Sequence, residues 1–266
     1  RWKKRLEYYM GESVKPTNVY KLIVAYLLWS KTHYKKFEEF DGIKIADILT
    51  KLKKGTVPTK AIEHSIPDWL AATFEKELGK NWEREMVALN EQAPTVLRTN
   101  SLKTTPRELI ADLNDENVEA FTIKNYPDAV QLAEKKNVFL TSAFKDGLFE
   151  VQDASSQKIG ELLDVKEGMR VVDACAGAGG KTLHLAALMK NKGQIIALDI
   201  YNWKLTELKR RAKRAGAHNI EARLITDNKV IKRLHEKADR LLIDAPCSGL
   251  GVLKRNPDSK WKIDQA

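Results

Sequence analysis

Residues 171–182 read VVDACAGAGGKT, a hydrophobic run that ends in an acid and leads into a glycine-rich loop. A phosphate-binding loop requires a glycine, then four residues, then Gly-Lys-Ser/Thr, and Cys175 stands where the first glycine should be. The dinucleotide-binding fingerprint Gly-x-Gly-x-x-Gly begins at Gly177 and Gly179, but its third position is Thr182. The ligand of the loop therefore has to be inferred from the sequence around it.

Strand-like and helix-like segments alternate on both sides of this loop. In order they are RVVDA, KTLHLAALMK, QIIALDI, KLTELKRRAKRAG, IEARLI and RLLIDAPC. This alternation predicts a doubly wound parallel α/β sheet. In the second helix one face carries Leu205, Leu208, Ala212 and Ala215, and the rest is basic, so that face is expected to pack inward.

Each predicted strand ends in or beside an acid, at the edge of the sheet where open α/β folds bind ligands. These acids are Asp173, Asp199, Asp227 and Asp244. Asp199, about twenty residues past the glycines, is placed to bind the hydroxyls of a ribose, whereas Asp227 either contacts an adenine or caps a turn. Four acids without a phosphate-binding lysine loop favour an adenosyl ligand that has no pyrophosphate. S-adenosylmethionine fits this pattern better than NAD.

The chain before the loop contains two further zones. Residues 1–90 predict a helical N-terminal module, and residues 91–152 predict a small α/β domain of short strands with one clear helix, which Thr105 caps and Pro106 begins. Residues 153–266 hold the part of the sheet described above. The expected fold class is thus α/β, a partial Rossmann-like sheet preceded by a small α/β domain and helices.

Composition narrows the class of protein. The 266 residues are 43% hydrophobic and 31% charged, without an apolar run long enough for a membrane span. Two cysteines make no disulfide framework and suggest the cytoplasm. The net charge of +10 divides into +5, −3 and +8 over residues 1–100, 101–200 and 201–266, which favours a nucleic-acid partner or else a solvated basic face. The histidines show no metal-ligand spacing, so we expect no metal; they are His33, His64, His184, His218 and His235.

The stretch DAPCSGLGVLKRNPD, residues 244–258, places Cys247 after a proline at a strand end. A lone cysteine is often only a packed side chain, but Asp244 and the Lys254-Arg255 pair nearby favour a reactive thiol. A thiolate that adds to C6 of a pyrimidine turns C5 into a nucleophile able to accept a methyl group. Methylation of an amino group needs no such thiol, so the sequence favours C5 methylation.

DACAGAGGKT and DAPCSGLGVLKRNPDSKW resemble the first and fourth motifs of the bacterial RsmB (Sun/Fmu)-type ribosomal RNA cytosine-5 methyltransferases, which are related to the NSUN enzymes. The stretches VQDASSQ, IPDWL and YPDAVQL resemble the same family, so the likeness covers about residues 66–266. This chain has Gly177-Ala178 where the family usually has Ala-Pro. The resemblance implies that S-adenosylmethionine is contacted by Cys175, Ala176, Gly177, Ala178, Gly179, Gly180, Lys181, Asp199, Asp227 and Asp244.

The resemblance also implies a role for Cys247. In this family the Pro-Cys thiol assists release of a covalent RNA adduct, and the attacking thiol belongs to a later Thr-Cys motif. We expect that motif, and the remaining strands of the sheet, beyond Ala266. The small α/β domain is expected to bind RNA, and Arg98, Lys254 and Arg255 are the candidate RNA contacts, with a structural salt bridge as the alternative for Arg98.

Other functions stay open on the sequence. A nicotinamide dehydrogenase would need a glycine at position 182, and the chain has none there. A non-catalytic RNA-binding fragment is a stronger alternative, as is a methyltransferase that acts on another RNA such as tRNA. DNA cytosine methyltransferases also use a Pro-Cys thiol, but in a different motif. The predicted reaction is therefore production of 5-methylcytosine in ribosomal RNA.

Overall fold

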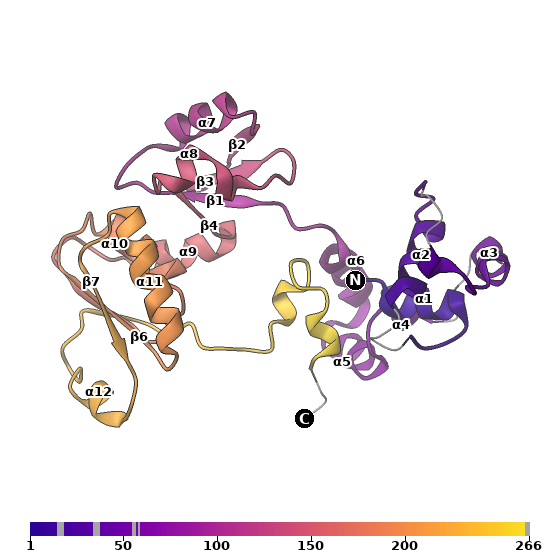
Figure 1. Ribbon diagram of the computed structural model, residues 1–266. Helices are drawn as coiled ribbons and strands as arrows, with labels where there is room; N and C mark the ends of the chain where they lie inside the picture. Colours follow the sequence, from indigo (N-terminus) through magenta and orange to yellow (C-terminus); the bar gives the residue numbers. More distant parts are fainter. Residues whose placement is uncertain (15–18, 34–37, 55–56, 58, 264–266) are drawn as a thin grey trace. The chain divides into compact units, whose positions relative to one another are not determined.

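The computed structural model describes residues 1–14, 19–33, 38–54, 57 and 59–263. The chain divides into two compact units, of which one is Arg1–Ala93 with Ser248–Ala266 and the other is Pro94–Cys247. The second unit contains both β-sheets and the glycine loop (Figure 1). The residues after Cys247, assigned from the sequence to the third zone, thus group with the N-terminal helices.

Helices make up the first unit over the residues described. Two apolar clusters hold it together, one from α1 to α3 around Val24 and Ile48 and the other around Ile66 and Met86. Its elements are α1 Lys3–Met10, α2 Val19–Trp29, η1 Glu38–Phe40, α3 Ile45–Lys54, α4 Lys60–Glu63, α5 Asp68–Leu78, η2 Gly79–Asn81, α6 Trp82–Asn90, η4 Leu250–Val252 and η5 Ser259–Trp261. The predicted helical module is the N-terminal part of this unit.

Two features attach the segment after Cys247 to these helices. Leu253 is buried, and Lys260 is only 1% exposed. The Arg1 guanidinium donates to the Lys254 carbonyl at 2.9 Å, and the Lys254 ammonium pairs with Glu91 at 2.9 Å. Burial, together with the positive charge of Arg1, lowers the pKa of Lys260 to about 8. Apolar burial and local ion pairs, rather than strand pairing, therefore fix the position of this segment.

An antiparallel sheet begins the second unit, with strand order β2-β3-β1-β4. Its elements are β1 Val96–Thr99, α7 Pro106–Asp115, β2 Ala120–Ile123, β3 Tyr126–Leu132, η3 Val138–Leu140, α8 Ser142–Lys145 and β4 Phe149–Val151. The βαββαβ succession is that of a ferredoxin-like domain. Thr105 and Glu108 form a complete capping box at the start of α7, with Pro106 in its first turn, as the sequence predicted.

A parallel sheet follows, with strand order β7-β6-β5-β8. Its elements are α9 Ala154–Leu162, β5 Arg170–Asp173, α10 Gly180–Leu188, β6 Gln194–Asp199, α11 Asn202–Ala215, β7 Ile220–Leu224, α12 Asn228–Lys232 and β8 Arg240–Leu242. Figure 1 shows α10 and α11 beside β6 and β7. The predicted doubly wound α/β class is confirmed.

Burial explains why these segments form strands and helices. The central strands β5 and β6 are covered on both faces, and Val171, Ile195 and Ile196 are fully buried. Leu205, Leu208, Ala212 and Ala215 form the buried face of α11, as the helical periodicity predicted. β8 is an edge strand of the sheet as described, and Leu241 and Ile243 beside this edge are 53% and 63% exposed. Among the described residues no helix has the length and apolar character required to cross a membrane.

Candidate cofactor site

The candidate site lies where the strand order reverses. From β5 the chain runs outward to β6 and β7 and then returns to β8 on the other side of β5. Loops that leave β5 and β8 in opposite directions open a crevice at the carboxyl ends of the strands, which is where open α/β sheets bind ligands. The glycine loop follows β5 and Asp244 follows β8, so the predicted site residues surround this switch point.

Backbone conformation explains the glycines of the loop. Gly177 and Gly179 have φ of +54° and +88°, a region that side chains other than glycine rarely adopt. A Cβ on Gly179 would lie 2.8 Å from Leu208 Cγ, whereas a Cβ on Gly177 or Gly180 would meet no atom within 4 Å. Gly179 thus packs against α11, and the backbone of Gly177 and Gly180 faces open space into which a ligand fits.

Asp199 fixes the loop from the end of β6. Its carboxylate accepts the Gly177 amide at 2.9 Å and the Tyr201 amide at 2.8 Å, and the residue is 7% exposed. A carboxylate has about four acceptor positions, so two backbone bonds leave capacity for the hydroxyls of a ribose. The Ala176 amide donates to the Leu198 carbonyl at 2.8 Å, which joins the same loop to the same strand.

A cavity of about 290 Å³ opens beside the loop. Its lining is Gln152, Ser156, Asp173, Cys175, Ala176, Gly177, Gly180, Lys181 and Asp244. The Lys181 ammonium pairs with Asp244 at 2.5 Å across this lining. The sequence identifies Asp173 as a strand-end acid but assigns it no ligand contact. It gives no signal for a ligand contact at Gln152 or Ser156, which lie in the chain between the two sheets.

Asp173 is a buried carboxylate at the end of β5. The Thr182 hydroxyl donates to it at 2.7 Å, and the residue is 1% exposed. Burial raises its pKa above the ordinary value, although the Thr182 hydrogen bond acts in the opposite direction. Because Thr182 is itself fully buried, this bond joins β5 to the first turn of α10. Thr182, the residue that breaks the dinucleotide fingerprint, therefore has a structural role.

The two cysteines differ in their surroundings. Cys175 lines the cavity, and burial raises the pKa of its thiol, as do the negative charges of Asp173 and Asp199. A raised pKa keeps this thiol protonated and unreactive at neutral pH. Cys247 is exposed and follows Asp244 by three residues. Of the two, Cys247 is the thiol that a macromolecular substrate can reach.

Two predicted site residues have other contacts in the structure. Asp227 caps α12, where its carboxylate accepts the Lys229 amide at 2.7 Å, and this corresponds to the turn-capping alternative. Arg98 is 3% exposed, which favours a structural role over contact with RNA phosphate. Its guanidinium donates to the Gly180 carbonyl at 2.5 Å and to the Gln152 side chain. Burial lowers the pKa of Arg98 to about 10, so the side chain stays charged at neutral pH.

The structure also locates Ala178, predicted to contact the cofactor, and Lys254 and Arg255, predicted to contact RNA. The Ala178 carbonyl accepts from Arg211 at 2.8 Å, and Ala178 does not line the cavity described above. Lys254 and Arg255 belong to the helical unit, where Lys254 pairs with Glu91. This ion pair is a structural explanation for Lys254 that competes with RNA binding.

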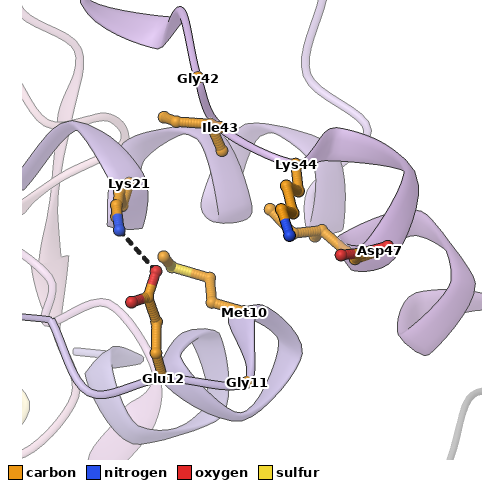
Figure 2. Close-up of a pocket in the computed structure, with 9 residues that line it drawn as sticks. Met10, Gly11, Glu12, Lys21, Gly42, Ile43, Lys44 and Asp47 are labelled. Carbon is orange, nitrogen blue, oxygen red and sulfur yellow. Dashed lines mark hydrogen bonds and ion pairs between the residues drawn. The ribbon is translucent and has the colours of Figure 1, made fainter.

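A second cavity, of about 390 Å³, lies within the helical unit. Figure 2 shows Glu12 and Lys21 facing each other there, with an ion pair of 2.6 Å, and Lys44 and Asp47 on the adjoining segment. No residue predicted from the sequence to be functional lines it. Glu12 pairs with Lys21, and Lys44 and Asp47 carry opposite charges, so this lining presents no cluster of like charge for a ligand.

In the described residues one group of side chains lies close enough together to hold a metal ion. Ligand atoms of Glu63, His64 and Glu83 lie within 4.8 Å of one another. The Lys60 ammonium lies 3.1 Å from Glu63 and 2.7 Å from Glu83, so a cation of the protein already pairs with both acids. Burial lowers the pKa of His64, which keeps its ring neutral at pH 7.

The parallel sheet, the glycine loop at its switch point and the acids at its strand ends define a Rossmann-like methyltransferase domain, preceded here by a ferredoxin-like domain. Residues 161–266 match the family model described as 16S rRNA methyltransferase RsmB/F, and residues 66–139 match the RsmF/B-like ferredoxin-like domain. The chain belongs to the RsmB/F methyltransferase family. The resemblance that the motifs indicated is thereby confirmed.

Individual relatives agree with this assignment. A probable ribosomal RNA small subunit methyltransferase B of Synechocystis sp. is 37% identical over 205 residues, which are 75% of this chain and 46% of that protein. The crystal structure of PH0851 has a TM-score of 0.74 at 28% identity and covers 98% of this chain and 60% of that one. NSun6 from Pyrococcus horikoshii with SFG, at 21% identity and a TM-score of 0.68, shares the fold over 75% of this chain and 74% of its own. The chain spans less than half the length of the curated relatives it matches.

Proposed function

We propose that the Pro94–Cys247 unit binds S-adenosylmethionine in the crevice beside the glycine loop, as part of an RNA methyltransferase. The observation that carries this proposal is the Asp199 carboxylate, which is held against the Gly177 amide at the switch point. The open space at Gly177 and Gly180 and the acid-rich lining suit an adenosyl ligand without phosphate. Cys175, Ala176, Lys181 and Asp244 are the further proposed contacts, with Asp227 toward the adenine if its cap rearranges.

Calorimetric titration of the 266-residue chain with S-adenosylmethionine tests this proposal. Asp199→Ala is expected to weaken binding by about 1.5–3 kcal/mol, because it removes a charged hydrogen-bond partner. Asp164→Ala is the matched control, since Asp164 is an exposed acid whose ion pair is with Lys166. Affinity that is unchanged in Asp199→Ala, or equally reduced in both variants, would remove Asp199 from the site.

The proposed reaction is methylation of C5 of cytosine in ribosomal RNA, which also suggests a cytoplasmic location. The family name and the relatives named as rRNA methyltransferases support RNA as the substrate. S-adenosylmethionine, when bound, supplies a methyl group on a sulfonium. A thiolate from the family's Thr-Cys motif, outside residues 1–266, adds to C6 of the base, so that C5 becomes nucleophilic. After methylation the C5 proton leaves to a base and the thiolate is expelled as the C5=C6 double bond re-forms.

Cys247 is the proposed assistant of that release. It is exposed and follows Asp244, which lines the candidate cofactor cavity. In a longer protein that contains this sequence and the Thr-Cys motif, Cys247→Ala should accumulate a covalent protein–RNA adduct, visible as a slow band on a denaturing gel. The variant that lacks the Thr-Cys thiol should give no band. Methyl transfer to cytosine by residues 1–266 alone would make Cys247 the nucleophile and refute this division of roles.

Competition experiments separate the alternatives. Unlabelled 16S rRNA should suppress labelling of an RNA substrate, and tRNA or DNA should not. Suppression by tRNA instead would assign another RNA to the same chemistry. Binding of RNA without measurable binding of S-adenosylmethionine would favour a non-catalytic RNA-binding role.

A further inference from the structure

Two arginines bind the glycine loop, Arg98 from the ferredoxin-like domain and Arg211 from α11 of the loop's own domain. Arg98 lies on β1 of the ferredoxin-like sheet, and its guanidinium reaches the Gly180 carbonyl at 2.5 Å. The same Nη1 atom donates to the side chain of Gln152, the residue after β4 that also lines the cavity. A fully buried, charged donor thus joins the first sheet to the residue where the loop becomes α10.

The second arginine is Arg211 on α11, which donates to the Ala178 carbonyl at 2.8 Å. Its other guanidinium nitrogens bind the Glu150 carboxylate at 2.9 and 3.3 Å. Glu150 lies on β4 of the ferredoxin-like sheet, is 5% exposed and also pairs with Arg214. The orientation of Arg211 toward the loop is therefore set by a carboxylate from the other domain.

The loop has a particular need for such contacts. Where the family usually has Ala-Pro, this chain has Gly177-Ala178, and a glycine there increases the backbone freedom that has to be lost when the loop is ordered. Of the two carbonyls bound by arginine, that of Ala178 belongs to this replacement and that of Gly180 follows it by two residues. The arginines restrict the segment that lacks the proline.

We propose that the ferredoxin-like domain is a functional part of the cofactor site, in which Arg98 and the Glu150–Arg211 pair are positioning residues that hold the glycine loop in its ligand-binding conformation. The inference rests on the proposed binding of S-adenosylmethionine at this loop. These three side chains influence cofactor affinity only through the Ala178 and Gly180 carbonyls. The same contacts also connect RNA and cofactor binding, because a ligand that shifts β1 or β4 shifts the loop.

Variants of the 266-residue chain test the proposal. Arg98→Met, which keeps an apolar stem but removes the donors, should weaken S-adenosylmethionine binding by roughly tenfold, within the usual range for coupled sites. Arg98→Lys, which retains a charge and one donor, should restore part of the affinity. Glu150→Gln and Arg211→Lys should each weaken binding, and the double variant should lose less than the sum of the two effects because they act through one contact.

Asn100 supplies the matched control. Its side chain donates to the Gly147 and Ala215 carbonyls, both at 2.8 Å, so it joins the same two domains without contacting the glycine loop. Asn100→Ser should lower the melting temperature and leave the dissociation constant for S-adenosylmethionine unchanged. A merely structural role for Arg98 would give the two variants the same profile.

Hydrogen exchange of peptides covering residues 174–180 keeps the test independent of ligand binding. In the unliganded chain, Arg98→Met should speed exchange of these amides, and Asn100→Ser should not. If the unaltered chain binds no S-adenosylmethionine, the proposed function fails while this exchange result still decides whether the arginines hold the loop. Unchanged loop exchange in Arg98→Met, or a tenfold loss of affinity in Asn100→Ser, would overturn the inference.

Discussion

Replacing Glu150 by glutamine removes the carboxylate that pairs with both Arg211 and Arg214. The Glu150 side chain is 6% exposed, and those of Arg211 and Arg214 are 17% and 19% exposed. Breaking a buried ion pair from one side costs about 3–5 kcal/mol, because the remaining charge stays buried without a partner. Both arginines keep some contact with water, so we expect the lower end, about 3 kcal/mol of the unfolding free energy of the Pro94–Cys247 unit.

Native-state hydrogen exchange measured by mass spectrometry reports this loss, because peptides from β4 and α11 give the opening free energy of their unit apart from the helical unit. Glu221→Gln is the control. Its carboxylate pairs with Arg223 at 2.6 Å but is 45% exposed, and a surface pair of this kind contributes about 0.2–1 kcal/mol. Equal losses in the two variants would refute the reasoning that burial, rather than pairing alone, makes Glu150 important.

Three further expectations concern stability and RNA binding. Burial raises the pKa of Asp173 in the folded chain above its value in the unfolded chain. The protonated side chain therefore favours folding below the unfolded pKa, and this contribution is lost as pH rises through the folded pKa. Asp173→Asn should raise the melting temperature at pH 7 more than at pH 4. Gly147→Ala should destabilise the fold strongly, because Gly147 has φ of +72° and the new Cβ would lie 2.2 Å from a backbone oxygen of α11. Gly168→Ala is the comparison. Gly168 has φ of +87° but no atom within 4 Å of the new Cβ, so this substitution should cost only about 1–2 kcal/mol. Reversal of Lys254 and Arg255 to glutamate should weaken RNA binding and flatten its dependence on salt, measured by filter binding, and an unaltered slope would assign these residues to the structure of the helical unit.

Local signals were sufficient to predict much of the fold. The parallel sheet follows from short apolar runs that alternate with amphipathic helices. The α7 cap follows from Thr105 and Pro106, because such an interaction is made within one turn of chain, and the structure adds Glu108 to it. The position of Asp199 next to the glycine loop follows from the rule that parallel strands present their carboxyl ends at one edge.

Features that depend on distant parts of the chain were not predictable in this way. Arg98 occurs in the polar-looking stretch LRTN, and its burial arises from packing against Gly180, a residue far along the sequence. Gln152 and Ser156 line the cavity because the chain between the sheets passes it, and no periodicity marks such a passage. The contacts of the segment after Cys247 depend on its apolar and charged neighbours in the helical unit, which its own sequence does not specify.

The strand order of the parallel sheet also bears on how the domain assembles as it is synthesised. Val171 of β5 pairs with Ile195 of β6, which follows soon in the chain, and with Arg240 of β8, which emerges only after two more helices. Closing the shorter connection costs less chain entropy, so β5, β6 and β7 are expected to pair first. The ferredoxin-like domain, synthesised earlier, is by then available to receive α10 and α11. The glycine loop can thus be ordered from the N-terminal side before β8 brings Asp244 to the crevice.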